Sequence, residues 1–230
     1  MLRIAFNRQP LLLLSRRTFA TEASSRALPS AVYTNASGKG DPSTTSTPED
    51  ITEAQRKVLD AALRVDQAGE IAANYIYNGQ LAILGRDRKL RPLIQEMWDQ
   101  EKKHLEVMNK LQVQHRVRPT LMWEVAKVAG YGLGAVTALL GKEAAMACTE
   151  AVETVIGEHY DDQLKELDEM STSHSSIPLL KEVIKEFRDD ELEHLDIAVE
   201  NDSQRAPAHA LLGTVIGGGC KVAIELCKRF

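Results

Sequence analysis

Apolar residues recur at spacings of three and four from about residue 48 to the C-terminus, which is the spacing of helices that bury one face. Proline, glycine and polar clusters divide this pattern into six segments, and none of them alternates apolar and polar residues between hairpin turns. The first segment begins with Thr47 and Pro48, which suit an N-cap and a first helical position. The chain is therefore predicted to be all-α. The expected helices span residues 48–84, 92–114, 119–140, 142–170, 178–201 and 207–228.

Two of the expected helices carry a Glu-x-x-His motif in the middle of their apolar face. Glu101 and His104 interrupt the stripe of the second helix, and Glu191 and His194 interrupt that of the fifth. Residues three apart lie on one face of a helix, so each motif presents a carboxylate and an imidazole together. A single motif of this kind on an acidic helix is usually a solvated surface. Two motifs placed in buried stripes indicate a shared site.

The helix before each motif has one carboxylate on its own apolar face. Glu70 occupies this place in the first helix and Glu153 in the fourth, where Glu150 is a rival on a poorer stripe. Glu70 precedes Glu101 by 31 residues, and Glu153 precedes Glu191 by 38. This repeat of helix pairs predicts a four-helix bundle built from two hairpins, with the third helix carrying the chain between them.

Four ionised carboxylates in an apolar interior are costly unless they are paired or bind metal. Two divalent cations would balance their charge, and a Glu from each of two helices with Glu-x-x-His from two others is the ligand set of di-iron bundles. Oxygen and imidazole ligands suit iron or manganese. Without metal the carboxylates should repel one another, so loss of Glu191 is expected to leave a folded and even more stable protein. The expected ligands are Glu70, Glu101, His104, Glu153, Glu191 and His194.

The N-terminal residues differ in composition from the rest. Residues 1–20 contain four arginines, no acidic residue and only a short apolar run, which is typical of a mitochondrial transit peptide. Residues 21–47 are rich in small and polar residues. We expect a transit peptide over 1–20, a disordered linker over 21–47 and one folded domain over 48–230. A disordered basic tail is the alternative for the first twenty residues.

Charge and cysteine content narrow the possible functions. The formal net charge is −5, and it becomes −9 once the six basic and two acidic residues of 1–47 are removed. This balance argues against nucleic acid as a partner. The three cysteines form no Cys-x-x-Cys pair, so a disulfide framework and a thiolate metal site are not expected. His115 has no partner in the pattern and is expected in a loop or at the surface.

The third and sixth helices are unusually apolar. Residues 128–141 form an uncharged run of 14, which as a helix is about 21 Å long and too short for a hydrocarbon core of about 30 Å. Lys221 interrupts the sixth helix. We expect both helices to lie in a membrane interface without crossing it. Packing against the bundle or a partner is the alternative. Gly130, Gly132 and Gly134 favour a close-packing or lipid-facing surface over a nucleotide-binding loop, because no strand precedes them.

Several segments resemble the 5-demethoxyubiquinone hydroxylase family, and the resemblance covers about residues 50–230. The stretch Thr137–Cys148, which reads TALLGKEAAMAC, is far more specific than Glu-x-x-His. The other segments are Arg64–Glu70, Trp98–His104, Ala151–Glu153 and Phe187–His194.

The resemblance implies a ferritin-like four-helix di-iron bundle with two additional apolar, membrane-interfacial helices. It implies a monooxygenase that uses O2 and two electrons, with NADH as their source, to hydroxylate a polyprenylated quinone in ubiquinone biosynthesis. Glu101 and Glu191 would bridge the two irons. The implied location is the matrix side of the mitochondrial inner membrane. The implied partners are membrane lipid, other biosynthetic proteins including one that binds lipid, and a further copy of the chain.

Tyr160 and His159 follow Glu153 within two turns of the same expected helix. Tyr160 shares its stripe and could relay a proton or an electron, although a hydrogen-bonded core tyrosine fits the pattern equally well. Two other functions remain compatible with the residues. One is a ferritin-like or rubrerythrin-like protein that stores iron or consumes peroxide, and the other is a non-catalytic lipid-binding scaffold.

Overall fold

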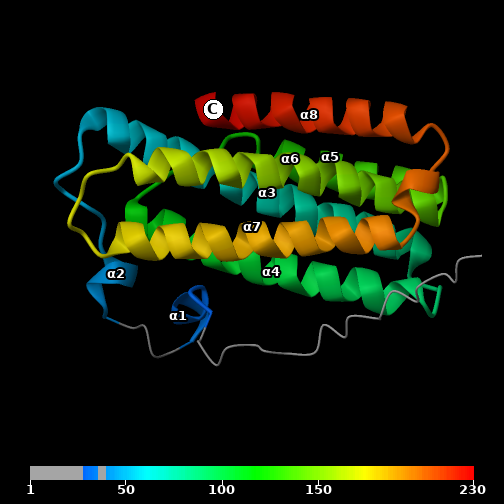
Figure 1. Cartoon of the computed structure of the whole chain (residues 1–230), viewed down its shortest axis with the longest axis horizontal. Coiled ribbons are helices and arrows are strands. Elements are labelled where there is room, and N and C mark those ends of the chain that lie inside the picture. Colours follow the sequence, from blue (N-terminus) through cyan, green and yellow to red (C-terminus); the bar gives the residue numbers. More distant parts are fainter. Residues whose placement is uncertain (1–27, 36–39) are drawn as a thin grey trace, which may run out of the picture.

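The computed structural model describes residues 28–35 and 40–230, and within these ranges it contains helices and no strand. The all-α prediction is confirmed. Two very short helices precede six longer ones, and a 3-10 turn joins the last two (Figure 1). The elements are α1 (Ala31–Thr34), α2 (Pro42–Thr45), α3 (Glu53–Leu84), α4 (Leu90–His115), α5 (Trp123–Leu139), α6 (Lys142–Asp168), α7 (Ser176–Glu200), η2 (Ser203–Arg205) and α8 (His209–Arg229).

The four helices α3, α4, α6 and α7 form a bundle from two hairpins, α3 with α4 and α6 with α7 (Figure 1). Each turns an apolar stripe inward, and the stripes meet in two core clusters toward the two ends of the bundle. Ile94, Met97 and Phe187 are fully buried in this interior. Burial of such side chains contributes about 1.5–3 kcal/mol each. The contacts of α3 with α4 and of α6 with α7 confirm the predicted pairing of helices into two hairpins.

Helix α5 packs on α3 at very short range because glycines face the contact. A Cβ atom added at Gly130 would lie 2.5 Å from the Ala72 carbonyl oxygen, and one at Gly134 would lie closer still to that of Ile76. A Cβ at Gly132 would meet nothing within 4 Å. Two of the three glycines thus serve close packing, and the third faces open space.

Helix α8 lies along the outside of the bundle, beside α6 (Figure 1). Ile216 and Cys227 are buried against the bundle, whereas Leu211, Val215 and Val222 are at least 60% exposed. Among the described residues, α8 is the one helix long and apolar enough to cross a membrane by length and composition. One face of α8 therefore packs on the bundle, and its other apolar face is exposed.

Helix α3 begins later than predicted. Thr52 caps it by accepting from the Gln55 backbone N–H, and the Gln55 side chain accepts from the Thr52 backbone N–H. This reciprocal capping box satisfies two backbone donors, so the helix begins after Thr52 and not after the predicted cap Thr47. The Thr47 hydroxyl instead lies 2.9 Å from Nδ1 of His115. His115 is fully buried, so its expected surface position is wrong.

Residues 28–35 and 40–47, which we call the N-terminal strap, pack against α4 and α7 on the side of the bundle away from α8 (Figure 1). The Tyr33 hydroxyl donates to Gln114 at 2.9 Å, and Lys110 donates to the Tyr33 carbonyl at 2.6 Å. Ser30 donates through its N–H and hydroxyl to the Glu186 carboxylate at 2.8 and 2.6 Å. This packing differs from the linker predicted over 21–47. The expected transit peptide over 1–20 lies outside the described residues.

Candidate metal centre

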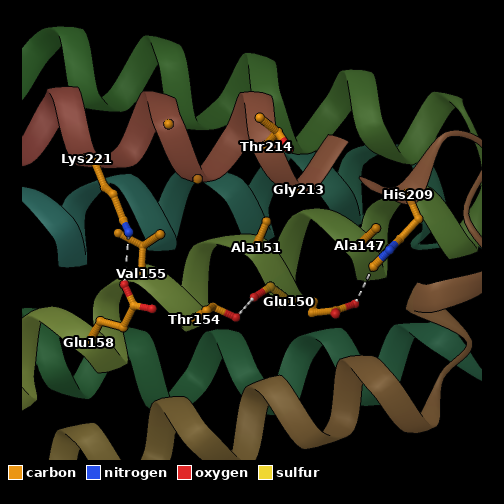
Figure 2. Close-up of a pocket in the computed structure, with 12 residues that line it drawn as sticks. Ala147, Glu150, Ala151, Thr154, Val155, Glu158, His209, Gly213, Thr214 and Lys221 are labelled. Atoms are coloured by element: carbon orange, nitrogen blue, oxygen red, sulfur yellow. Dashed lines mark hydrogen bonds and ion pairs between the residues drawn. The ribbon is translucent and has the colours of Figure 1, made fainter. Parts of the chain in front are cut away.

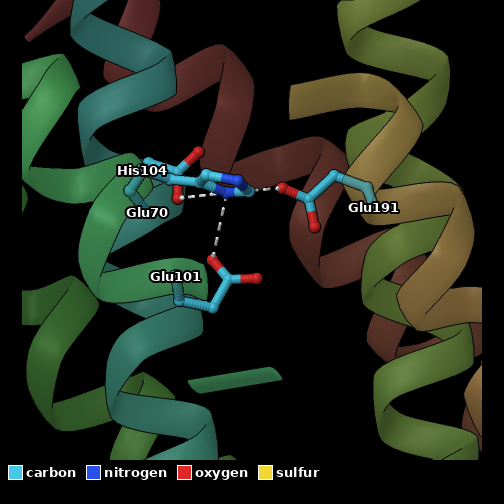
Figure 3. Close-up of side chains that lie close together, drawn as sticks. All are labelled: Glu70, Glu101, His104 and Glu191. Carbon is cyan, nitrogen blue, oxygen red and sulfur yellow. Dashed lines mark ion pairs between the residues drawn. The ribbon is translucent and has the colours of Figure 1, made fainter. Parts of the chain in front are cut away.

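Six side chains from the four bundle helices converge in the interior. They form two overlapping groups whose ligand atoms lie within 4.8 Å of one another. Glu101 and Glu191 belong to both groups, and all six residues are at most 3% exposed. Figure 3 shows the first group around the His104 ring. The first group is Glu70, Glu101, His104 and Glu191, and the second is Glu101, Glu153, Glu191 and His194.

Both imidazoles turn Nδ1 toward the carboxylates. His104 Nδ1 lies 3.4 Å from Glu191 Oε1 and 3.6 Å from Glu70 Oε2. His194 Nδ1 lies 3.1 Å from Glu101 Oε1 and 3.3 Å from Glu191 Oε2. Each group therefore gathers one nitrogen and three carboxylates around a small volume.

Several buried atoms of this cluster have no hydrogen-bond partner among the described residues. They include Nδ1 of both histidines, both oxygens of Glu101 and one oxygen each of Glu70 and Glu191. A buried polar atom without a partner costs about 1–3 kcal/mol. Cations bound between these atoms would satisfy them, so the donor set fits two oxygen- and nitrogen-liganded metal ions.

Two tyrosines cross between the helices that carry single carboxylates. The Tyr160 hydroxyl donates to Glu70 at 2.6 Å, and the Tyr77 hydroxyl donates to Glu153 at 2.9 Å. Each tyrosine follows the glutamate of its own helix by seven residues and bonds the glutamate of the other. Sequence reasoning singled out Tyr160 and missed Tyr77, although the equal spacing was a usable signal.

A second reciprocal pair contacts the outer nitrogens of the histidines. His104 Nε2 lies 2.9 Å from Asp190 Oδ2, and His194 Nε2 lies 2.5 Å from Gln100 Oε1. Because both partners are acceptors, Nε2 donates its proton to them, and Nδ1 would offer its lone pair to a cation once the cation displaces the proton that the metal-free cluster holds. Asp190 and Gln100 each precede the glutamate of a Glu-x-x-His motif. Sequence reasoning missed both, and their position next to the motifs was the available signal.

Burial and neighbouring charges shift the pKa values of the cluster strongly. Burial raises the pKa of Glu70 to about 8 and that of Glu153 well above its usual range, and nearby carboxylates add to both effects. Burial alone would lower the pKa of His194, but Glu101 and Glu191 raise it to about 11. Although burial opposes it, the close approach of both histidines lowers the pKa of Glu191 to about 2. The metal-free cluster thus holds protons that cations would displace.

His159 lies beside this cluster without a hydrogen bond to it. Its Nε2 is 3.3 Å from Asp66 Oδ1, and the other oxygen of Asp66 accepts from Gln163 at 2.7 Å. The side chain is 13% exposed. His159 and Asp66 both line a cavity of about 460 Å³ enclosed by α3, α5, α6 and α8. The structure therefore brings Tyr160, but not His159, into contact with a predicted ligand.

That cavity runs from the surface to the cluster and is lined mainly by apolar side chains such as Ala126, Leu133 and Ile216. Four cluster carboxylates face it, those of Glu70, Glu101, Glu153 and Glu191.

A separate groove of about 370 Å³ lies between α6 and α8 (Figure 2). Glu150 faces this groove and pairs with His209 at 2.9 Å, while Lys221 pairs with Glu158 at 3.1 Å. Glu150, the rival of Glu153 in the sequence, is thus held on the outer face of α6, away from the six clustered side chains.

A four-helix bundle whose interior gathers four carboxylates and two imidazoles in this pattern defines the class of ferritin-like dimetal carboxylate proteins. Within that class, the chain matches the sequence profile of the ubiquinone biosynthesis protein COQ7 family over residues 57–227, and it belongs to that family.

Curated relatives agree with this membership. A Bos taurus protein named NADPH-dependent 3-demethoxyubiquinone 3-hydroxylase, mitochondrial, is 53% identical over 174 residues, covering 76% of this chain and 79% of the relative. A Saccharomyces cerevisiae protein named 5-demethoxyubiquinone hydroxylase, mitochondrial, is 44% identical over 191 residues, covering 79% and 82%. A Rhodospirillum rubrum protein named 3-demethoxyubiquinol 3-hydroxylase is 46% identical over 172 residues, covering 75% and 78%. The family resemblance predicted from the sequence is confirmed.

Proposed function

We propose that this protein is a di-iron monooxygenase that hydroxylates the ring of a polyprenylated demethoxyubiquinone in ubiquinone biosynthesis. The observation that carries the proposal is the apolar cavity that ends on four of the clustered carboxylates. A lipid-tailed quinone needs an apolar path, and its ring must reach the metal centre. The names of the relatives point to the same reaction.

In this proposal the six clustered side chains hold two iron ions. Glu70 and His104 would hold one ion and Glu153 and His194 the other, and Glu101 and Glu191, which belong to both groups, would contribute to both positions. Iron bound there supplies the activation of O2. The net reaction replaces a ring C–H by C–OH with one oxygen atom of O2, and two electrons and two protons convert the other atom to water.

The chain's own residues exclude water and hold protons. The apolar lining of the cavity keeps bulk water from the ring, which strengthens every electrostatic interaction inside. Tyr160 keeps its proton because burial raises its pKa well above the usual range, and it donates that proton to Glu70 in a hydrogen bond. His159 with Asp66 forms a polar pair in the cavity wall. We assign Tyr160 and His159 to proton delivery, to be tested by the turnover of Tyr160→Phe and His159→Gln.

The electrons come from a reduced nicotinamide nucleotide. The family resemblance implied NADH, whereas the mammalian relatives are named NADPH-dependent. Both nucleotides carry the same nicotinamide ring, so direct comparison of the two at equal concentration decides the donor. Quinone reduction without added reductase would identify the bound quinone as the electron acceptor.

The two outer helices are the proposed membrane contact. Val128 and Val136 of α5 are 75% and 57% exposed, and Val215 and Val222 of α8 are 64% and 60% exposed. We place this face in the matrix-side leaflet of the mitochondrial inner membrane, where quinone can enter the cavity from lipid. A lipid-binding biosynthetic protein or a second copy of the chain would use the same face. High salt should release little protein from membranes, and Val128→Asp with Val136→Asp should release more.

Residues 1–20 are the proposed import signal. A chain that starts at Leu28 keeps the N-terminal strap and should retain turnover but fail to reach mitochondria. A chain that starts at Thr47 also loses the buried Tyr33 and its bonds, so it should be less stable. Normal mitochondrial delivery of the Leu28 form would contradict the proposed signal.

The decisive test follows the oxygen atom. Iron-loaded protein, a short-tailed demethoxyubiquinone, a reductant and ¹⁸O2 should give quinone product with one ¹⁸O. Glu191→Ala, which removes a residue of both metal groups, should give none. Iron oxidation without quinone product would favour an iron-storing or peroxide-consuming protein. Failure to bind iron would favour a scaffold.

A further inference from the structure

The two halves of the proposed metal centre repeat one another, but they differ in one charged contact. Both single glutamates accept a hydrogen bond from a tyrosine, at 2.6 Å for Glu70 and 2.9 Å for Glu153. The outer nitrogens of the histidines do not share this symmetry. Asp190 faces Nε2 of His104 and Gln100 faces Nε2 of His194. One half therefore has a carboxylate where the other has a neutral amide.

The two acceptors act differently on the imidazole they contact. A carboxylate bonded to Nε2–H orients the ring and pushes electron density toward Nδ1, which makes Nδ1 a better metal ligand. An amide oxygen orients the ring without adding charge. Asp190 makes no ion pair with a lysine or arginine in the described part of the chain, so its charge acts on His104 without competition. Its side chain is 25% exposed, so solvent screens the contact only in part.

We propose that the two metal positions are inequivalent, and that the position bounded by Glu70 and His104 binds its cation more tightly than the one bounded by Glu153 and His194. Asp190 is the positioning residue that creates the difference, and Gln100 is its neutral counterpart. The inference rests on the proposed dimetal centre. The ligands alone would suggest two equal positions, whereas this difference predicts that the position with Glu70 and His104 fills with metal first.

Anaerobic calorimetric titration of the full-length protein with ferrous iron tests the proposal. The wild type should take up two ions in two resolved steps. Asp190→Asn keeps the shape of the side chain and removes its charge, and it should weaken the tighter step by roughly 10- to 100-fold while the weaker step stays in place. Asp189→Asn is the matched control, because Asp189 is exposed and bonds Arg188 instead. It should leave both steps unchanged.

Two further variants assign the steps to the two halves. His104→Ala should remove the tighter step, and His194→Ala should remove the weaker one. Gln100→Glu gives His194 a carboxylate partner and should strengthen the weaker step until the two merge. Thermal unfolding of each variant verifies that it is folded.

The possible results separate the inference from the proposed function. Uptake of two ions with Asp190→Asn matching the Asp189→Asn control would leave the dimetal centre standing and overturn the inference. Equal weakening of both steps by Asp190→Asn would also overturn it. Wild-type protein that takes up no iron would overturn both.

Discussion

Replacement of Glu191 by glutamine should abolish most of the stabilisation that metal gives to this protein. Glu191 belongs to both ligand groups, and its two oxygens lie 3.4 Å from His104 Nδ1 and 3.3 Å from His194 Nδ1. Glutamine has nearly the same shape, but its amide nitrogen cannot bind a cation and its charge is zero. Both metal positions should therefore weaken together, while the packing of α7 is kept.

The magnitude follows from linkage between binding and folding. Two ions, each at 100 times its dissociation constant, stabilise the folded protein by about 2.7 kcal/mol apiece, or about 5 kcal/mol in total. For a domain of this size that corresponds to a rise in Tm of about 10–20 °C. If each dissociation constant rises about 100-fold in Glu191→Gln, the same free iron contributes only about 1 kcal/mol in total.

The metal-free variant should also be less stable than the metal-free wild type. The geometry reverses the stability gain expected from the sequence, because Glu191 pairs with both histidines and its pKa falls to about 2. Breaking a buried pair of this kind costs about 3 kcal/mol. Glu193 is exposed on the same helix, and Glu193→Gln should change stability by less than about 0.5 kcal/mol.

The assay is thermal unfolding by circular dichroism with and without anaerobic ferrous iron, together with the iron content of each protein. Wild type and Glu193→Gln should show the full shift in Tm and two ions, and Glu191→Gln should show neither. A full shift and two ions in Glu191→Gln would refute the shared-ligand geometry. Loss of both in Glu193→Gln would show that the wrong face of α7 had been assigned to the site.

Three other perturbations test separate parts of the structure. Tyr77→Phe removes the donor from a buried carboxylate and should cost about 1–3 kcal/mol in metal-free urea unfolding; an unchanged midpoint would contradict the contact. Metal-free protein should lose stability as pH rises from about 4.5 to 8, because unfolded Glu70 releases its proton near pH 4.5 whereas folded Glu70 holds it until about pH 8. Stability should fall further toward pH 11, because the folded protein holds the His194 proton up to that pH and the unfolded protein does not. Iron-loaded protein should instead gain stability between pH 4.5 and 8 as cations replace protons, and Tm measured across this range in both forms tests the difference. Gly134→Ala drives a methyl group into the α3 backbone and should cost about 1–3 kcal/mol, whereas Gly132→Ala faces open space and should cost nothing in the same unfolding assay.

The sequence by itself determined the helices and the six clustered side chains. Apolar spacing of three and four is a local property of a helix, so the stripes could be read without any tertiary contact. Glu101 and Glu191 could be placed inside because they interrupt those stripes. The repeat of a single carboxylate before each motif also determined which helices pair as hairpins.

The tertiary structure decided everything that depends on contacts between helices. Asp190 and Gln100 become partners of the histidines only because each reaches across to the other motif helix. Their place beside the motifs marks them as candidates, but it does not show which side chain on another helix each one contacts. The same holds for Tyr77, which bonds a carboxylate on α6. These contacts depend on how the helices are rotated and offset against one another, and residue spacing along one helix does not contain that information.

The N-terminal strap shows the same limit at the edge of the fold. Its composition is that of a linker, because it has few apolar residues and many small polar ones. It is ordered because the bundle supplies partners, including Gln114 and Glu186, to its polar groups. The observed start of α3 differs from the predicted one for a related reason, since Thr52, five residues after the predicted cap Thr47, forms a reciprocal capping box with Gln55. Local composition indicates whether a segment would be ordered by itself, and the contacts that it makes with the bundle decide whether it is ordered in the folded protein.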